Sequence, residues 1–241
     1  MTVAFTLPGG VPVYAFSLLV GAGASLGFWR LITGVSQEIR GQAVAAGFAL
    51  MLIGLAGARL VYQFNHPAAA VEIPFGGLSW GGALLSGWAS LPLISRATGI
   101  PAGRLADAVY PLPAAVLTSA WLGCWVDGCA YGPPTDAWFG LAARDDWGNL
   151  TVRFPLQFLG ACLALLTLVG ADFIRTKTAK PGLTAGLWLT ATGLQFWWLQ
   201  SLRVDPSPFW LGFPLNLWAA GVTGLLGILL VLKSFRTRLK A

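Results

Sequence analysis

Few side chains in this sequence could carry out chemistry, and four of them fall at the ends of long apolar segments. Arg59 lies near the end of the second such segment, Arg153 just before the fifth, and Arg203 with Asp205 at the end of the sixth. Ionisable groups are costly in hydrocarbon, which makes each a candidate functional group, and guanidinium groups bind phosphate through paired hydrogen bonds. These four residues therefore predict a phospholipid headgroup site. The alternative for each arginine is a position at the membrane surface, where its side chain reaches out to lipid phosphate.

Two further residues are candidates for proton transfer. Asp127 follows the fourth apolar segment, and His66, the only histidine, lies in Asn65-His66-Pro67. A carboxylate or an imidazole can accept a proton from a reacting group. The alternatives are an ordinary solvated carboxylate and an imidazole on the surface of a loop.

The three cysteines do not form a pattern typical of a metal site. Cys124 and Cys129 are five residues apart, and Cys162 lies within the fifth apolar segment. We expect small buried thiols, with a disulfide or a metal site as the alternative. The motifs of phosphate-binding loops, serine hydrolases, zinc proteases and haem attachment do not occur, so no cofactor and no metal are predicted.

The elements that must position these residues are apolar throughout. Of the 241 residues, 56% are hydrophobic and only 10% are charged, and the mean hydropathy is +0.70. A soluble domain carries about 25% charged residues, so this chain lacks the polar surface that water requires. The composition predicts one all-α integral membrane domain over residues 1–241, a bundle of about seven transmembrane helices. The predicted spans are Val11–Ile32, Gly41–Phe64, Gly77–Ile94, Leu105–Trp125, Pro155–Ile174, Gly182–Leu202 and Phe213–Leu232.

The fourth span is the least regular of the seven. It contains Pro111 and Pro113, and proline kinks a helix unless neighbouring groups satisfy the freed carbonyls. A broken or re-entrant element is the alternative at this place. Residues 127–154, rich in Gly, Pro, Asp and Trp, form the longest predicted segment outside the membrane.

The distribution of charge predicts the orientation. With seven spans, eleven of the fifteen basic residues fall on one side, and the rule that basic loops are cytoplasmic places the N-terminus outside and the C-terminus inside. The same rule accounts for the net charge of +6, so no nucleic-acid partner is expected. The basic residues on the predicted cytoplasmic side are Arg30, Arg40, Arg96, Arg104, Arg175, Lys177, Lys180, Lys233, Arg236, Arg238 and Lys240.

Residues 106–140, ADAVYPLPAAVLTSAWLGCWVDGCAYGPPTDAWFG, resemble the signature region of the prolipoprotein diacylglyceryl transferases. Gly128, Tyr131, Gly132 and Asp136 fall on the family's Gly-Glu-Leu-Tyr-Gly element and the Pro-Thr-Asp turn that follows it. The resemblance continues over nearly the whole chain and matches the family's seven spans. Further blocks that resemble the family are Gly57-Ala58-Arg59-Leu60, Gly76-Gly77-Leu78-Ser79-Trp80, Arg153-Phe154-Pro155-Leu156-Gln157 and Arg203-Val204-Asp205-Pro206.

The resemblance implies a reaction and its partners. The family transfers a diacylglyceryl group from phosphatidylglycerol to the thiol of a lipobox cysteine in a prolipoprotein, at the outer face of the bacterial inner membrane. Such chemistry needs a cavity open to lipid, cations for the departing glycerol phosphate, and a group that helps to deprotonate the thiol. A phosphatidylglycerol-like lipid is the expected partner, with a prolipoprotein or another membrane subunit beside it.

Several of the family's polar positions hold other residues in this chain. The family's signature arginine, asparagine and glutamate fall on Trp121, Cys124 and Cys129. The histidine of its Ser-Phe-His block falls on Gly81 or on a gap. The tyrosine of its first span falls on Phe16, and the tyrosine after its Arg-His-Pro block falls on Leu159. Two functions stay open as a result: a divergent active transferase, and a non-catalytic relative that binds lipid or lipoprotein or scaffolds a membrane complex. A small transporter or cofactor-bearing subunit is a third hypothesis, without a ligand cluster to support it.

Overall fold

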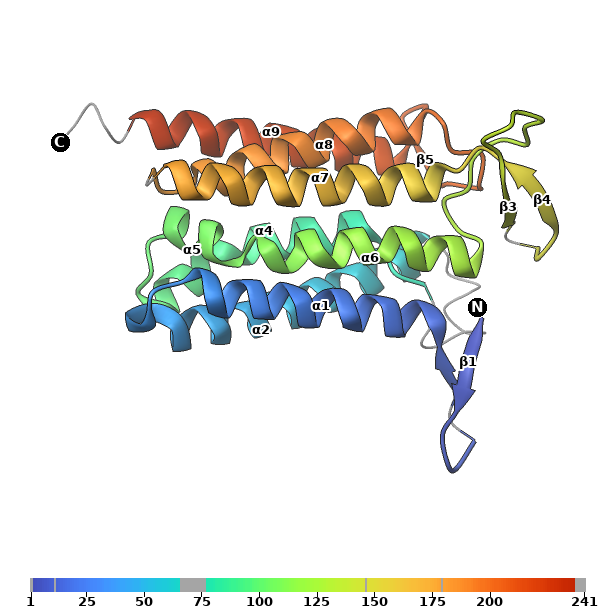
Figure 1. Cartoon of the computed structure of the whole chain (residues 1–241). Coiled ribbons are helices and arrows are strands. Elements are labelled where there is room, and N and C mark those ends of the chain that lie inside the picture. The colour runs from blue at the N-terminus through green and yellow to red at the C-terminus, as the bar shows by residue number, and fades with distance from the viewer. Residues whose placement is uncertain (1, 11, 66–76, 146, 179, 237–241) are drawn as a thin grey trace.

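The protein is a bundle of long antiparallel helices, described here by a computed structural model that covers residues 2–10, 12–65, 77–145, 147–178 and 180–236 (Figure 1). In chain order the described helices are α1 (Ala15–Gly34), α2 (Gln37–Asn65), α4 (Trp80–Thr98), α5 (Ala102–Val109), α6 (Pro111–Asp127), α7 (Leu156–Lys177), α8 (Leu183–Gln200) and α9 (Leu215–Arg236). The most extensive helix–helix contacts are those of α8 with α9, α1 with α6, and α2 with α4.

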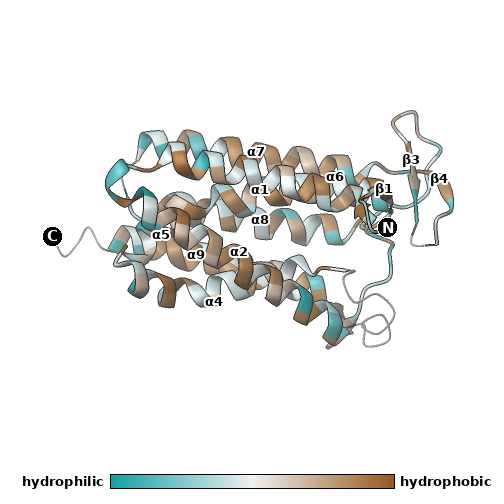
Figure 2. Ribbon diagram, turned by 90° about the horizontal axis from the view of Figure 1, so that it is seen from below, coloured by the Kyte–Doolittle hydropathy of each residue, from teal (hydrophilic) through white to brown (hydrophobic). Residues whose placement is uncertain are grey.

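Length and surface both mark the bundle as a membrane domain. Within the described residues, α1, α2, the α5–α6 pair, α7 and α9 are long and apolar enough to cross a membrane. Large apolar side chains also face outward, and Leu60, Leu93 and Leu166 are each about two-thirds exposed. Hydrophobic residues run along the helices, whereas hydrophilic ones gather towards their ends (Figure 2). Such an apolar exterior suits lipid rather than water, and the predicted membrane helical bundle is confirmed at this level.

Each of the seven predicted apolar segments coincides with a helical stretch. The fourth is broken at the place where its prolines lie: α5 ends at Val109, Tyr110 joins the two pieces, and α6 begins at Pro111. Proline has no N–H to donate, and the N–H of the first residue of a helix has no acceptor within that helix, so its loss at this position costs no hydrogen bond. Pro111 therefore starts a new helix instead of interrupting one.

Three short antiparallel hairpins lie at one end of the bundle, beside the N-terminus (Figure 1). They pair β1 (Val3–Thr6) with β2 (Pro12–Tyr14), β3 (Leu141–Arg144) with β4 (Leu150–Arg153), and β5 (Phe209–Trp210) with β6 (Phe213–Pro214). The expectation of an all-α chain is therefore incomplete. β2 and β6 run directly into apolar helices, so hydropathy alone merges each strand with the helix that follows it. The first and last helices begin at Ala15 and Leu215 for this reason.

The core consists of two clusters of buried residues, one towards each end of the bundle, and depends on close helix contact. At the seam between α8 and α9, a Cβ atom added to Gly193 would lie 2.4 Å from the backbone nitrogen of Gly224. Only glycine lets two membrane helices approach this closely. The half of the core next to the hairpins centres on Trp121, Phe196 and Leu199.

Charged residues tie the helices together at the end opposite the hairpins. The Asp107 carboxylate accepts hydrogen bonds from the backbone N–H groups of Gly182 (2.6 Å) and Ala185 (2.8 Å), which caps the start of α8. Asp172 of α7 forms an ion pair with Arg30 of α1 and accepts a hydrogen bond from the Tyr110 hydroxyl. Helices far apart in the sequence are thereby fixed to one another.

Candidate functional site

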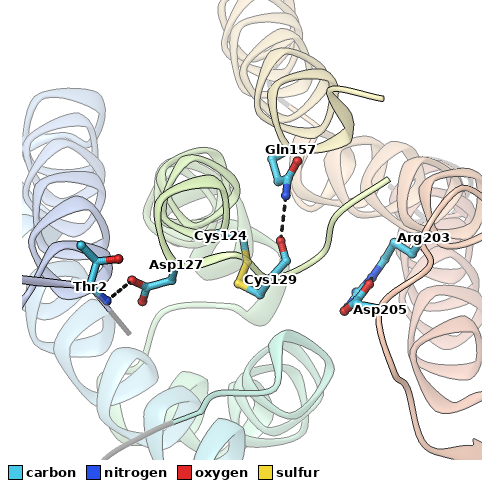
Figure 3. The surroundings of a disulfide bond; sticks show 7 residues. All are labelled: Thr2, Cys124, Asp127, Cys129, Gln157, Arg203 and Asp205. Atoms are coloured by element: carbon cyan, nitrogen blue, oxygen red, sulfur yellow. Dashed lines mark hydrogen bonds and ion pairs between the residues drawn. A yellow bond between two sulfur atoms is a disulfide. The ribbon is translucent and has the colours of Figure 1, made fainter. Parts of the chain in front are cut away.

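A disulfide closes the end of α6 beside the hairpins. Gly128 adopts a left-handed conformation (φ 79°) just after the helix, and the backbone N–H of Cys129 then donates to the Cys124 carbonyl at 2.9 Å. This turn brings the two cysteines together, with their Cα atoms 4.6 Å apart, and they form a disulfide (Figure 3). The expectation of free thiols is wrong for this pair, because a five-residue spacing does not reveal that the chain reverses at Gly128. Cys162 is a free cysteine.

The loop after the disulfide packs tightly against the β3–β4 hairpin. A Cβ atom added to Gly128 would lie 2.9 Å from the Asp145 carbonyl oxygen, and one added to Gly132 would lie 2.7 Å from the carbonyl oxygen of Phe154. Glycine is therefore required at both signature positions. Ala130, between them, has φ of 52°, a conformation that non-glycine residues rarely adopt and that the surrounding contacts must hold.

Arg153 is buried beneath this loop and contacts other protein groups. Its guanidinium carbon lies 4.6 Å from the centre of the Tyr131 ring, and its Nη2 is 3.4 Å from an Asp145 oxygen. Its Nη1 makes a long hydrogen bond of 3.5 Å to the Gly132 carbonyl. The cation thus binds the signature loop to the hairpin, through a stacking contact and a charge pair.

Asp145 organises the turn of the same hairpin. Its carboxylate accepts hydrogen bonds from the backbone N–H groups of Trp147 and Asn149 and from the Asn149 side chain. Burial alone would raise the pKa of Asp145, but these hydrogen bonds and the nearby Arg153 outweigh burial and lower its pKa below the ordinary value. The carboxylate is therefore ionised at neutral pH.

Arg203 and Asp205 form the second charged group, just beyond α8. The Arg203 Nε donates to one Asp205 oxygen at 2.7 Å and its Nη2 donates to the other, so the pair is bidentate. Both side chains are largely buried, 14% and 6% exposed. Between them, the Val204 N–H donates to the Tyr131 carbonyl at 3.2 Å, which joins this segment to the signature loop.

A cavity of about 360 Å³ opens beside this pair, and we call it the polar pocket. Its walls include Gln200, Arg203, Asp205 and Ser207. Among the described residues, the Gln200 Nε2 and the Ser207 Oγ are buried without a hydrogen-bond partner. Buried polar groups usually have partners, and a polar ligand in the pocket could supply them once these two covered side chains turn towards it. Together with the guanidinium they could bind an anion or a hydroxylated headgroup.

The other predicted site residues lie apart from the polar pocket. Asp127 accepts a hydrogen bond from the backbone N–H of Thr2 at 2.7 Å, and Figure 3 shows it turned towards Thr2, across the disulfide from Arg203. The Arg59 Nη1 donates to the Gly77 carbonyl at 3.2 Å. Asp136 is exposed on the signature loop. His66 lies outside the described residues.

Comparison with known proteins gives the family. The profile described as prolipoprotein diacylglyceryl transferase matches residues 2–233. The chain belongs to this family. Similar proteins named phosphatidylglycerol–prolipoprotein diacylglyceryl transferase occur in Leifsonia xyli (30% identical, 74% of this chain and 61% of the relative), Frankia alni (27%, 89% and 61%) and Streptomyces griseus (27%, 95% and 75%). The chain thus spans about 61% of the length of the first two relatives.

The structure explains two positions at which this transferase family member departs from the family pattern. A Cβ atom at Gly81 would lie 2.6 Å from the Cβ of Ala219 on α9, so a histidine has no room there. Trp121, the residue on which the resemblance places the signature arginine, is buried against Phe196 with ring centres 5.5 Å apart. Phe196 stacks in turn on Trp80 at 3.9 Å. Aromatic packing fills the part of the bundle where the family pattern places a charged side chain.

Three polar residues of the site were missed from the sequence. Gln157 is fully buried and donates to the Cys129 carbonyl at 3.0 Å, while Gln200 and Ser207 line the polar pocket. A glutamine within an apolar helix is a usable signal, because its amide must find a partner in the bundle. Ser207 follows a proline in a loop and gives no comparable signal.

Proposed function

We propose that this protein transfers a diacylglyceryl group from phosphatidylglycerol to the cysteine thiol of a prolipoprotein. The observation that carries the proposal is the polar pocket, where a buried arginine meets unpartnered polar atoms at the end of a membrane helix. Family membership and the names of the relatives support the choice of substrate. The partners are then a phosphatidylglycerol-like lipid and a prolipoprotein.

The pocket belongs at the outer surface of the bacterial inner membrane if the bundle crosses seven times with the N-terminus outside and the C-terminus inside. The Cys124–Cys129 disulfide lies at the end with the hairpins, and disulfides persist in oxidising compartments outside the cytoplasm. Basic residues in the last turns of α4, α7 and α9 gather at the opposite end. Two independent features, redox chemistry and charge, therefore favour the same orientation.

In the proposed reaction, the Arg203 guanidinium binds the phosphate of phosphatidylglycerol. The lipobox thiolate attacks the terminal carbon of the diacylglyceryl group, so that a C–S bond forms and the C–O bond to phosphate breaks. Glycerol phosphate leaves with the electron pair, and Arg203 stabilises its charge. When the phosphate accepts the hydrogen bonds that Arg203 donates to Asp205, the Asp205 carboxylate is released. Asp205 lines the pocket, so it can then accept the proton of the thiol. Asp127 and His66 are the other proposed acceptors.

The remaining arginines act around this centre in the proposal. Arg153 positions the signature loop, because its guanidinium is held by Tyr131 and Asp145. Arg59, near the end of α2 and bonded to Gly77, contacts a headgroup at the rim of the bundle.

Transfer from phosphatidylglycerol to a lipobox peptide, measured with the purified protein in nanodiscs, tests the proposal. Replacing Arg203 alone leaves Asp205 buried without its cation, which destabilises the fold. The informative variant is therefore the double substitution Arg203→Gln/Asp205→Asn, which removes both charges and keeps the shape. We expect it to lower the rate about a hundredfold or more, as for loss of a transition-state donor.

The matched control is Arg144→Gln, which removes an exposed arginine of β3 at the same end of the bundle. It should transfer at the rate of the unmodified protein. Full transfer by the double variant would show that Arg203 does not bind the phosphate. Absence of transfer by the unmodified protein would reject the enzymatic function in favour of a lipid-binding relative.

A further inference from the structure

A shallow groove of about 200 Å³ runs between α8 and α9 on the surface of the bundle, and we call it the apolar groove. Its floor is backbone, because Gly193 and Gly224 bring the two helices into contact. A Cβ atom added to Gly224 would meet only two backbone atoms of Gly193, at 3.7 and 4.0 Å, so the space above Gly224 is open. Leu194 and Leu225 form its walls, and both are more than half exposed. The groove therefore opens sideways towards lipid.

The apolar groove and the polar pocket lie one after the other along the same two helices, with Trp197 between them. Thr190, Gly193 and Trp197 line the groove, and Gln200 lines the pocket. These residues follow one another at spacings of three, four and three, which places them on one side of α8. Gln200 comes about 4.5 Å beyond Trp197 along the helix. Pro214, just before α9, also lines the pocket, so the chain at the start of α9 borders the pocket as the end of α8 does.

We infer that the apolar groove holds one acyl chain of the phospholipid whose phosphate lies in the polar pocket. This inference rests on the proposed function, and it names where the lipid substrate binds. The occupant must be apolar beside Gly224 and anionic beside Arg203, where the Gln200 amide offers a further donor. A phospholipid meets both conditions and can enter from the bilayer through the open side. A helix from a second copy would fill the groove but leave the polar pocket without a ligand.

Photolabelling tests this placement directly. Phosphatidylglycerol with a diazirine in the middle of an acyl chain is added to the protein in nanodiscs, illuminated, and the labelled peptides are identified. Gly224→Leu fills the groove from a position with room for a Cβ atom. Gly170→Leu on α7 is the matched control, because a Cβ atom there meets nothing within 4 Å. Gly224→Ala serves as a smaller filling variant should leucine impair folding.

We expect labelling of α8 and α9 in the unmodified protein and in the control. In Gly224→Leu, labelling of these helices should fall about tenfold, which is the scale on which apolar pockets distinguish ligands that differ by one or a few methylene groups. In parallel, the ratio of transfer rates for dipalmitoyl over dioctanoyl phosphatidylglycerol should fall in Gly224→Leu alone.

Unchanged labelling of α8 and α9 in both Gly224 variants would overturn the inference. A second copy as the occupant would show itself differently: mild oxidation of Leu225→Cys in a Cys162→Ser background would give disulfide-linked dimers, and that result would overturn the inference. Labelling of the groove by a protein that transfers no lipid would reject the proposed function and leave the acyl-chain site standing.

Discussion

Removal of the disulfide should lower the free energy of unfolding by about 2 kcal/mol. The bond joins Cys124 to Cys129, five positions apart, and for a closed loop this short the chain-entropy relation gives about 7 cal/mol/K, or roughly 2 kcal/mol at 25 °C. The left-handed turn at Gly128 and the hydrogen bond from Gln157 to the Cys129 carbonyl already restrict the same residues, so this value is an upper one. In a chain of this length, 2 kcal/mol corresponds to a fall of about 4–8 °C in Tm.

Thermal unfolding in detergent measures this effect. The Cys124→Ser/Cys129→Ser variant should unfold at a lower temperature than the unmodified protein, and a reductant should bring the unmodified protein to the same Tm. Cys162→Ser is the control, since Cys162 forms no disulfide, and its Tm should stay unchanged. A reductant that lowers the Tm of the double-serine variant as much as that of the unmodified protein would contradict this account. So would alkylation of all three cysteines in the unfolded, unreduced protein, because cysteines joined in a disulfide cannot be alkylated.

Three further substitutions test contacts elsewhere in the bundle. The folded-state pKa of Asp145 is lowered, so its carboxylate stabilises the hairpin at pH values above the unfolded pKa of about 4, and this stabilisation is lost as the pH falls through the folded-state pKa. Hydrogen exchange of the β3 and β4 amides, measured between pH 7 and 3, should show this loss. The Asp145→Asn variant should not show it. Asp107→Ala should lower the free energy of unfolding by about 1–2 kcal/mol, because two N–H groups at the start of α8 lose their acceptor; an unchanged Tm would contradict this. Gly160→Ala should destabilise by roughly 1–2 kcal/mol, since its Cβ would lie 2.4 Å from the Trp121 ring, whereas Gly170→Ala should not.

The helices could be predicted from the sequence because their signal is local. Apolar segments of about 20 residues between charges and prolines locate the long helices to within a few residues, and Pro111 locates the boundary between α5 and α6. The hairpins could not be predicted in this way. Strands of two to four residues bury little, and their pairing depends on turns that hydropathy does not record.

The candidate site was predictable only where its partners are close in the sequence. Arg203 and Asp205 are two residues apart, and charge at the end of a span was enough to identify them. The disulfide depends instead on the backbone conformation of Gly128, and Gln200 depends on the loop that folds over it. Contacts of these kinds follow from the path of the chain, which no single residue pattern specifies.

The departures from the family pattern concentrate the proposed chemistry at one place. Gly81 faces Ala219 too closely for a side chain, and Trp121 packs with Phe196, so the centre of the bundle near the hairpins is apolar. The rings of Trp80 and Trp121 both pack on Phe196 there, and a phosphate bound against these rings would lose its hydration without compensation. The polar pocket lies beyond the end of α8, outside this aromatic core, and it contains Arg203. If the protein is a transferase, the polar pocket is where we expect the phosphate to bind, and the reaction should depend on Arg203 more than it would in a relative with a second arginine at the position of Trp121.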